Sequence, residues 1–393
     1  MRGNFSKLFI VTFNIIMSYL SMLSIRSKKI YVFGAWEGNK FSDNSKSLYI
    51  EALKDKNILA VWITKNKIIY DAMKAKGFKV HMHNSFKGVY YQLRASVYFT
   101  CMKRSDVVQE LMGNATRINL WHGVGLKKIL FDDKITHFKS KATKARIMRM
   151  INYLPYIRKD YVISTSDKIS EIFTSAFRRK RENILQLGQP RNDVFFDDSL
   201  ETEILPFKNG AEKIILYMPT HRNFGKKKMF MKDILDLKIL NEFCSKNNTI
   251  FIIKKHYCHY NEIEELSELN YLKDVTQIEY DPQQLLKHAD ILITDYSSCY
   301  VDYLLLDRPV IFYNYDHDDY VLNDRDLYFD YNTTTPGEKV KDFKGLYTAL
   351  KHIVVDGIDP FQEKREVIKN IFYSKDNQKK VGEKILKFVK ENL

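Results

Sequence analysis

Short apolar runs alternate with longer amphipathic stretches along most of this chain. The first series predicts strands at 29–34, 59–63, 79–81, 97–100, 117–121, 161–164 and 184–187, and the second at 214–218, 249–253, 276–278, 291–294 and 310–313. Amphipathic stretches predict helices at 44–54, 68–76, 86–94, 343–355, 360–373 and 378–389. Strands that alternate with helices build parallel sheets from βαβ units. The pattern therefore predicts an α/β protein with two doubly wound, Rossmann-type domains.

One break in the alternation marks the expected domain boundary. Residues 197–212 contain Pro206 and the turn signal Asn209-Gly210. We expect an N-terminal segment of 1–28, a first domain of 29–205 and a second domain of 206–393. Two doubly wound domains would face a central cleft with their strand ends, which is the layout of a GT-B-type transferase.

The chain carries a net charge of +15, which favours anionic partners such as nucleic acid, anionic lipid or a phosphate-rich substrate. Basic residues are dense from Lys134 to Arg149. A nucleic-acid-binding protein is one interpretation, but no recognised binding motif is present. The basic clusters also lack interleaved aromatic residues for base stacking, so no nucleic-acid partner is predicted. The 4 cysteines are widely spaced, which predicts no disulfide framework and is typical of a reducing cytosol.

The N-terminal segment has no charged residue from Leu8 to Ile25. Within it, Asn14, Ser18 and Ser21 share one helical face, and large apolar residues lie opposite. This pattern favours an amphipathic helix in the plane of an anionic membrane surface. A cleaved signal peptide, a transmembrane anchor and a helix packed on the protein itself are the alternatives.

An apolar run at 291–293 ends in Thr294 and Asp295, and Ser297 and Ser298 then open a segment with helical character. A helix that begins just beyond a strand offers unpaired backbone N–H groups, so it can hold a phosphate. Either serine could equally be a plain helix cap. Asp302, two turns further, either faces the pocket or supports a neighbour.

Two other strand ends carry groups suited to phosphate oxygens. Thr220 and Arg222 follow one strand, and Lys254 and His256 follow the next. In isolation, a surface arginine would be the commoner explanation of Arg222. Cys258 and His259 lie near His256, but ligands this close in sequence have poor geometry without a further partner, so no metal site is predicted.

In the first domain, Trp121-His-Gly-Val-Gly125 follows a predicted strand. The glycines allow a sharp turn, from which His122 would project at the strand end. A histidine there can accept a proton from an alcohol as a general base. The alternative is a histidine that only caps the loop.

Taken together and in order, the motifs resemble those of the CDP-glycerol glycerophosphotransferase family of teichoic acid and capsule assembly. The matching residues are Asn44-Ser-Lys46, Trp121-His-Gly123 with Lys127, Gly188-Gln-Pro-Arg-Asn-Asp193, Tyr217-Met-Pro-Thr-His-Arg222, Lys254-Lys-His256, Thr294-Asp-Tyr-Ser-Ser298 through Asp302 to Tyr313, and Pro336-Gly337. Gly125, His221 and Tyr257 depart from the residues common in the family.

This resemblance implies a GT-B-like, peripheral membrane enzyme on the cytoplasmic face of the cell membrane. It implies transfer of glycerol phosphate from CDP-glycerol to an undecaprenyl-diphosphate-linked saccharide or a growing polyol-phosphate chain, with release of CMP and without a cofactor. Carried onto the matching positions, His122 is the catalytic base. The donor site comprises Thr220, Arg222, Lys254, His256, Asp295, Ser297, Ser298 and Asp302, with Arg191 and Asp193 shaping the cleft.

Two other activities fit the same motifs. One is transfer from CDP-ribitol or another CDP-polyol, which the family motifs do not separate from CDP-glycerol. The other is a GT-B glycosyltransferase that uses a sugar nucleotide. Retaining enzymes of that kind often carry two glutamates eight residues apart, whereas the nearest counterparts here, Asp295 and Asp302, are seven apart.

Overall fold

The computed structural model describes residues 2–133, 159–200, 211–222, 228–256, 259, 266, 268–278, 280–317, 320 and 327–393, with side chains from Thr12 onward. The basic stretch from Lys134 to Arg149 thus lies outside the described residues. The chain forms two compact units. Unit 1 comprises Met1–His122, Thr136–Asp193 and Asp376–Leu393, and unit 2 comprises Gly123–Ile135 and Val194–Lys375.

This division differs from a single boundary at residue 205. The last helix, α15 (Val381–Asn392), belongs to unit 1 because its buried residues Val381, Ile385 and Val389 pack into the core of that unit's sheet. The residues that directly follow His122 belong to unit 2. The order of elements along the chain reveals neither the return of α15 to unit 1 nor the membership of the residues after His122 in unit 2.

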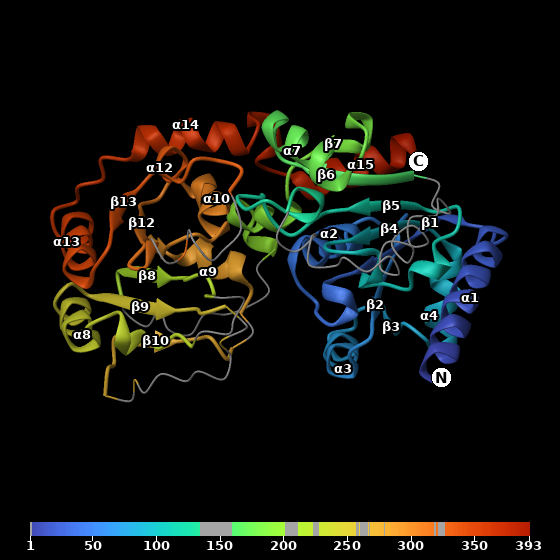
Figure 1. The fold of residues 1–393 in the computed structure, drawn as a ribbon, viewed down its shortest axis with the longest axis horizontal. Coiled ribbons are helices and arrows are strands. Elements are labelled where there is room, and N and C mark those ends of the chain that lie inside the picture. The colour runs from blue at the N-terminus through green and yellow to red at the C-terminus, as the bar shows by residue number, and fades with distance from the viewer. Residues whose placement is uncertain are drawn as a thin grey trace. The chain divides into compact units, whose positions relative to one another are not determined.

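Unit 1 is built on a parallel sheet, whose strands are labelled in Figure 1. Its strand order is β3-β2-β1-β4-β5-β6-β7. The strands are β1 (Ser27–Gly34), β2 (Leu59–Thr64), β3 (Val80–Met82), β4 (Ala95–Thr100), β5 (Thr116–Asn119), β6 (Lys159–Ser164) and β7 (Ile184–Gln186). Its helices are α1 (Arg2–Met22), α2 (Asp43–Leu53), α3 (Lys67–Ala75), α4 (Phe86–Arg94), α7 (Asp167–Phe177) and α15.

Alternate residues of β1 are buried on opposite faces of this sheet. Tyr31 and Phe33 join a core that contains side chains of α2 and α15. Ile30 and Val32 join a second core, against which Tyr91 of α4 packs. Burial on both faces is typical of a central parallel strand, and it explains why β1 reads as a continuous apolar run.

Unit 2 repeats this architecture with a parallel sheet of order β10-β9-β8-β11-β12-β13. The strands are β8 (Lys213–Tyr217), β9 (Thr249–Ile253), β10 (Leu272–Asp274), β11 (Ile291–Thr294), β12 (Val310–Tyr313) and β13 (Glu338–Val340). The helices are α8 (Leu237–Lys246), α9 (Pro282–His288), α10 (Cys299–Tyr303), α12 (Tyr331–Thr334), α13 (Phe343–Val354) and α14 (Gln362–Phe372). Together the two units confirm the predicted α/β class with two parallel sheets.

The strand predicted at 276–278 is wrong, because the edge strand β10 lies at Leu272–Asp274 instead. Thr276 is a turn residue, and its hydroxyl accepts a hydrogen bond from the Lys255 N–H at 3.0 Å. In both sheets the strand order reverses beside the first strand, between β1 and β4 and between β8 and β11. Ligands of doubly wound sheets bind at such switch points.

Helix α1 confirms the predicted separation of faces, but its polar face points toward the protein. Ser18 and Ser21 are buried, and the Ser21 hydroxyl accepts the Gly113 N–H at 2.9 Å. Phe13, Ile16 and Leu20 are 52%, 52% and 54% exposed. Within the described part of the chain, no helix has the length and apolar character needed to cross a bilayer. The structure shows α1 as an amphipathic helix packed on unit 1.

Candidate active site

His122 lies just beyond the end of β5, and its ring orientation is fixed by a backbone carbonyl. The Nδ1 atom lies 3.2 Å from the carbonyl oxygen of Cys101. A carbonyl oxygen only accepts hydrogen bonds, so Nδ1 must carry the proton. In the neutral ring the lone pair is then on Nε2, which is the form that a general base requires. The rings of Trp121 and Trp36 lie 4.1 and 5.7 Å from the imidazole.

The backbone around His122 is braced from α2 and from the chain after β7. The Asn44 amide donates to the Trp121 carbonyl at 2.9 Å and accepts the Arg191 N–H at 3.0 Å. The Arg191 guanidinium donates to the His122 carbonyl and to the Asp43 carboxylate, both at 3.0 Å. Arg191 and Asn44 therefore hold the loop that carries the imidazole.

Strained backbone concentrates around this histidine. Trp36, Asp43 and Trp121 have φ values of 49°, 65° and 55°, and Gly123 has a φ of 148°. Residues other than glycine rarely adopt positive φ, and each such position costs on the order of 1–3 kcal/mol. Such strain persists where the surrounding structure enforces it, which is common at functional sites.

Asp193 caps a helix of its own unit. Its carboxylate accepts the N–H groups of Val381 and Gly382, at the start of α15, at 2.9 and 2.7 Å. Burial raises the pKa of Asp193 to about 6, although the two backbone N–H groups oppose the shift. Asp193 thus connects the end of the segment Thr136–Asp193 to the start of α15.

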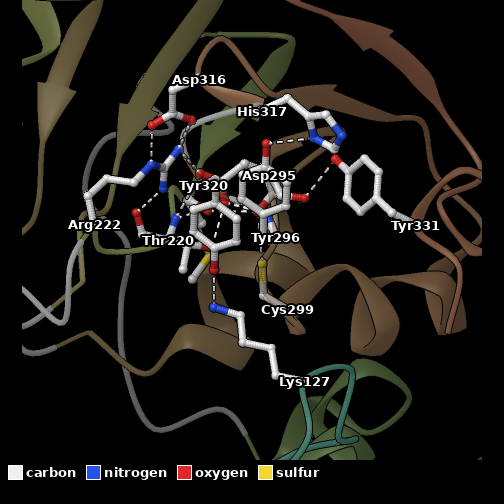
Figure 2. A network of polar contacts seen from close by, with 12 residues as sticks. Lys127, Thr220, Arg222, Asp295, Tyr296, Cys299, Asp316, His317, Tyr320 and Tyr331 are labelled. Atoms are coloured by element: carbon white, nitrogen blue, oxygen red, sulfur yellow. Dashed lines mark hydrogen bonds and ion pairs between the residues drawn. The ribbon is translucent and has the colours of Figure 1, made fainter. Parts of the chain in front are cut away.

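In unit 2, Asp295 joins the ends of β8 and β11 across the switch point (Figure 2). Its carboxylate is fully buried and accepts the Thr220 N–H at 2.9 Å and the Thr220 hydroxyl at 2.5 Å. It also accepts the Tyr296 N–H at 2.6 Å and pairs with Arg222 at 2.8 Å. Asp295 therefore organises the site from within.

Arg222 is 4% exposed and lies between two carboxylates. Besides Asp295, it makes a two-pronged contact with Asp316 at 2.6 and 3.0 Å, and it donates to the Thr220 carbonyl at 2.6 Å. Burial lowers the pKa of Arg222, but the two aspartates outweigh burial and hold it above its ordinary value. Asp316, which lies outside the matching sequence motifs, is thus part of the site.

Aromatic rings cover this ion cluster. Tyr296 and Tyr320 stack at 3.7 Å with an interplanar angle of 8°, and the Arg222 guanidinium lies 5.1 Å from the Tyr320 ring. Lys127 donates to the Tyr320 hydroxyl from the other side, as Figure 2 shows. Lys127 also forms an antiparallel bridge with Leu327. The segment that follows His122 is therefore anchored to the same cluster as Asp295.

The residues after Asp295 differ in their surroundings. Ser297 and Ser298 are partly exposed, and the Ser297 hydroxyl accepts the Cys299 N–H at 3.4 Å. Helix α10 has only five residues, which is shorter than the sequence suggested. Asp302 is 1% exposed and accepts hydrogen bonds from the Gln283 amide at 2.9 Å and the Tyr373 hydroxyl at 2.5 Å. Of the two roles considered for Asp302, the structure favours support of α10.

At the end of β9, Lys254 donates to the carbonyl oxygens of Val275 and Ile278. The half-buried His256 ring lies 4.7 Å from that of His221, which follows β8. The two strand ends therefore bring their histidines together. Among the residues that the structure describes, no group of three or more His, Cys, Asp or Glu side chains is arranged to hold a metal ion.

Comparison with known proteins gives a consistent result. Residues 16–391 match the family model described as CDP-glycerol:poly(glycerophosphate) glycerophosphotransferase. The chain is 30% identical over 361 residues to a teichoic acid poly(glycerol phosphate) polymerase of Bacillus spizizenii, covering 88% of this chain and 89% of the relative. It is 31% identical over 260 residues to a teichoic acid ribitol-phosphate polymerase of Staphylococcus aureus, covering 63% of this chain and 44% of that relative.

Solved structures agree. The wall teichoic acid polymerase TagF superposes with a TM-score of 0.77 at 27% identity, covering 100% of this chain and 99% of the solved one. A TagF variant soaked with CDPG gives a TM-score of 0.75, also at 27% identity, with coverage of 100% and 98%. A UDP-GlcNAc 2-epimerase of Neisseria meningitidis, 12% identical, gives a TM-score of 0.53 over 92% of this chain and 100% of that one, which shows a shared fold alone.

Proposed function

Because the chain belongs to the CDP-glycerol:poly(glycerophosphate) glycerophosphotransferase family, a family of transferases, we propose that it transfers glycerol phosphate from CDP-glycerol. The acceptor is a hydroxyl of a lipid-linked saccharide or of a growing polyol-phosphate chain, and CMP is released. The observation that carries this proposal is the hydrogen bond between Nδ1 of His122 and the Cys101 carbonyl, which puts the lone pair of the neutral ring on Nε2. We place the reaction in teichoic acid or capsule synthesis because of the relatives' established names.

In the reaction, the acceptor oxygen attacks the phosphorus bonded to glycerol. Nε2 of His122 takes the hydroxyl proton as the new P–O bond forms. The bond to the leaving phosphate of CMP breaks and carries its electron pair with it. General-base catalysis of this kind contributes about 10²–10⁴-fold in rate.

The donor diphosphate is held by the strand ends of unit 2. His256 and the hydroxyls of Ser297 and Ser298 are partly exposed and supply hydrogen-bond donors, with Lys254 adding positive potential. Such preorganised donors supply a large part of the stabilisation of developing charge. Thr220, Arg222 and Asp295 shape this surface from below, and Asp302 supports α10.

Catalysis by this route requires His122 and the bound donor to reach one cleft, as in a GT-B-type transferase. Arg191 acts there through its hydrogen bond to the His122 carbonyl, and Asp193 through its contacts with α15. A bifunctional cross-link between cysteines introduced near His122 and Ser298 checks this requirement. Donor-dependent cross-linking supports a shared cleft, and its absence with donor bound contradicts it.

We also assign α1 to the cytoplasmic face of an anionic membrane, as a peripheral anchor. Its outward apolar face, with Leu20 54% exposed, and the following turn residue Leu23, 80% exposed, would enter the acyl boundary. The exposed Lys28 and Lys29, which follow α1, complement anionic headgroups. This location would bring the enzyme to an undecaprenyl-diphosphate-linked acceptor.

Vesicle sedimentation tests the anchor. Leu20→Glu with Leu23→Glu should weaken binding to anionic vesicles at least about tenfold, because each leucine contributes roughly 1.5–3 kcal/mol on burial. Ile68→Glu is the matched control, because Ile68 is an exposed apolar residue of α3 in the same unit. Equal binding by wild type and the double variant would refute the anchor.

The substrate is tested by incubating the protein with CDP-glycerol, CDP-ribitol and a UDP-sugar, each with a lipid-linked acceptor, and analysing products by mass. CDP-glycerol should give a product heavier by glycerol phosphate, together with CMP. Preference for CDP-ribitol would move the donor to the class of the ribitol-phosphate relatives. Turnover of the UDP-sugar alone would refute phosphoglycerol transfer.

A further inference from the structure

A buried carboxylate lies one peptide group away from His122. Asp106 is fully buried, and its Oδ2 atom accepts the N–H groups of Cys101 and Met102 at 2.9 and 2.8 Å. Its Oδ1 atom accepts the Glu37 N–H at 2.8 Å. Three backbone donors thus converge on a single side chain that neither the family motifs nor the site described above includes.

The peptide group between Cys101 and Met102 is the connection. Its N–H donates to Asp106, and its carbonyl oxygen accepts the Nδ1 proton of His122. A carboxylate that accepts the N–H of a peptide polarises the group and makes its carbonyl a stronger acceptor, since hydrogen bonds in a chain reinforce one another. The negative charge of Asp106 thereby acts on the His122 imidazole through this peptide group.

We propose that Asp106 is a positioning residue that fixes the proton of His122 on Nδ1 and raises the basicity of Nε2, acting through the Cys101–Met102 peptide. The logic is that of the aspartate which orients a catalytic histidine in a hydrolase triad, with a peptide group inserted between the two side chains. This inference rests on the proposed function in treating His122 as the general base.

The charged groups near this chain of contacts include Asp43, Arg191 and Arg117. Burial raises the pKa of the Cys101 thiol, Asp43 and Asp106 raise it further, and Arg191 lowers it. These charges therefore lie close to the Cys101–Met102 peptide. Burial raises the pKa of Asp106, while its backbone donors and Arg117 favour the charged form. The carboxylate only accepts in these bonds, as the ionised form requires.

The test is a titration of His122 by NMR of protein labelled with ¹⁵N-histidine, with the His122 signals assigned by their loss in His122→Asn. In the wild type the neutral ring should carry its proton on Nδ1. Asp106→Asn should lower the pKa of His122 by about one unit, as expected for one charge acting at an effective dielectric constant near 20. The acid limb of kcat/KM should move to lower pH by the same amount.

Glu37→Gln is the matched control, because it removes a neighbouring charge whose side chain pairs with the exposed Lys103 and not with the peptide. That variant should leave the pKa of His122 unchanged within about 0.2 units. Asp106→Glu, which keeps the charge, should restore most of the wild-type value. A variant that only destabilises the fold would lower kcat/KM without shifting the acid limb of its pH profile.

A neutral His122 protonated on Nε2, or an unchanged pKa in folded Asp106→Asn, would overturn the proposal. If Asp106→Asn does not fold, the tautomer of His122 in the wild type and the pKa of His122 in Asp106→Glu decide instead. Nδ1 protonation with a retained pKa supports the positioning role of Asp106, and Nε2 protonation rejects it. Full activity of His122→Asn would instead refute His122 as the general base, while the titration of His122 still tests the positioning role of Asp106.

Discussion

Removal of Arg222 should destabilise unit 2. Its guanidinium compensates Asp295, whose side chain is 0% exposed, and Asp316, whose side chain is 11% exposed. Arg222→Ala leaves both carboxylates in low dielectric without the compensating charge of the guanidinium. Breaking a buried pair in this way costs about 3–5 kcal/mol. For a unit of this size, such a loss lowers the melting temperature by about 10 °C.

The two units can be followed separately, because Trp36, Trp62 and Trp121 are the only tryptophans and all lie in unit 1. Tryptophan fluorescence therefore reports unfolding of unit 1, whereas far-UV circular dichroism reports both units. Arg222→Ala should move an early part of the dichroism transition to lower denaturant and leave the fluorescence transition in place. Arg117→Ala, which breaks the buried contact with Asp160 in unit 1, should move the fluorescence transition instead.

A second comparison separates stability from donor binding. Arg365 is a buried arginine of unit 2 that pairs with Asp307 and Asp359, outside the candidate site. Under conditions in which both variants are folded, Arg222→Ala should weaken CDP-glycerol binding and Arg365→Ala should not. A dichroism transition in Arg222→Ala within about 0.5 kcal/mol of wild type would refute the assignment of Arg222 to a buried ion cluster.

Two further predictions concern unit 1. Because the pKa of Asp193 is raised to about 6, the folded protein keeps a proton that the unfolded chain loses near pH 4. The stability that Asp193 contributes therefore falls as the pH rises from about 4 to about 6. Denaturant titrations should show that the free energy of unfolding depends less on pH in Asp193→Asn. An equal slope in both proteins would contradict the shift. Asn44→Ala removes the hydrogen bonds that Asn44 makes to the Trp121 carbonyl and the Arg191 N–H. The free energy of unfolding measured by tryptophan fluorescence should therefore fall by about 1–3 kcal/mol. A loss below about 0.5 kcal/mol would contradict the role of Asn44 in holding the His122 loop.

The sequence located strands well where both faces are buried. The predicted limits at 249–253, 291–294 and 310–313 coincide with β9, β11 and β12, because continuous apolar runs between polar residues have visible ends. The edge strand β10 contains Lys273 and Asp274, so its composition gave no such run. The short edge strand β13 was missed for a similar reason.

Strand-end motifs pointed to residues that the structure brings together in unit 2, but not to the pairings among them. Thr220, Arg222 and Asp295 were expected to contact the donor, whereas the structure pairs them with one another, because contacts across more than 70 residues leave no local pattern. Asp106 and Asp316 lie outside the recognised motifs, where an aspartate resembles any other loop residue. The polar face of α1 was visible from its spacing, but not that it would be the buried face.

The central claim is that His122 is the general base for attack on a CDP-activated glycerol phosphate. It is tested most directly by comparing CDP-glycerol affinity by calorimetry with the single-turnover rate of CMP release in wild type and His122→Asn. We predict an affinity within about threefold of wild type and a rate lower by about 10²–10⁴-fold. A His122→Asn protein that binds donor and releases CMP at the wild-type rate would contradict the account.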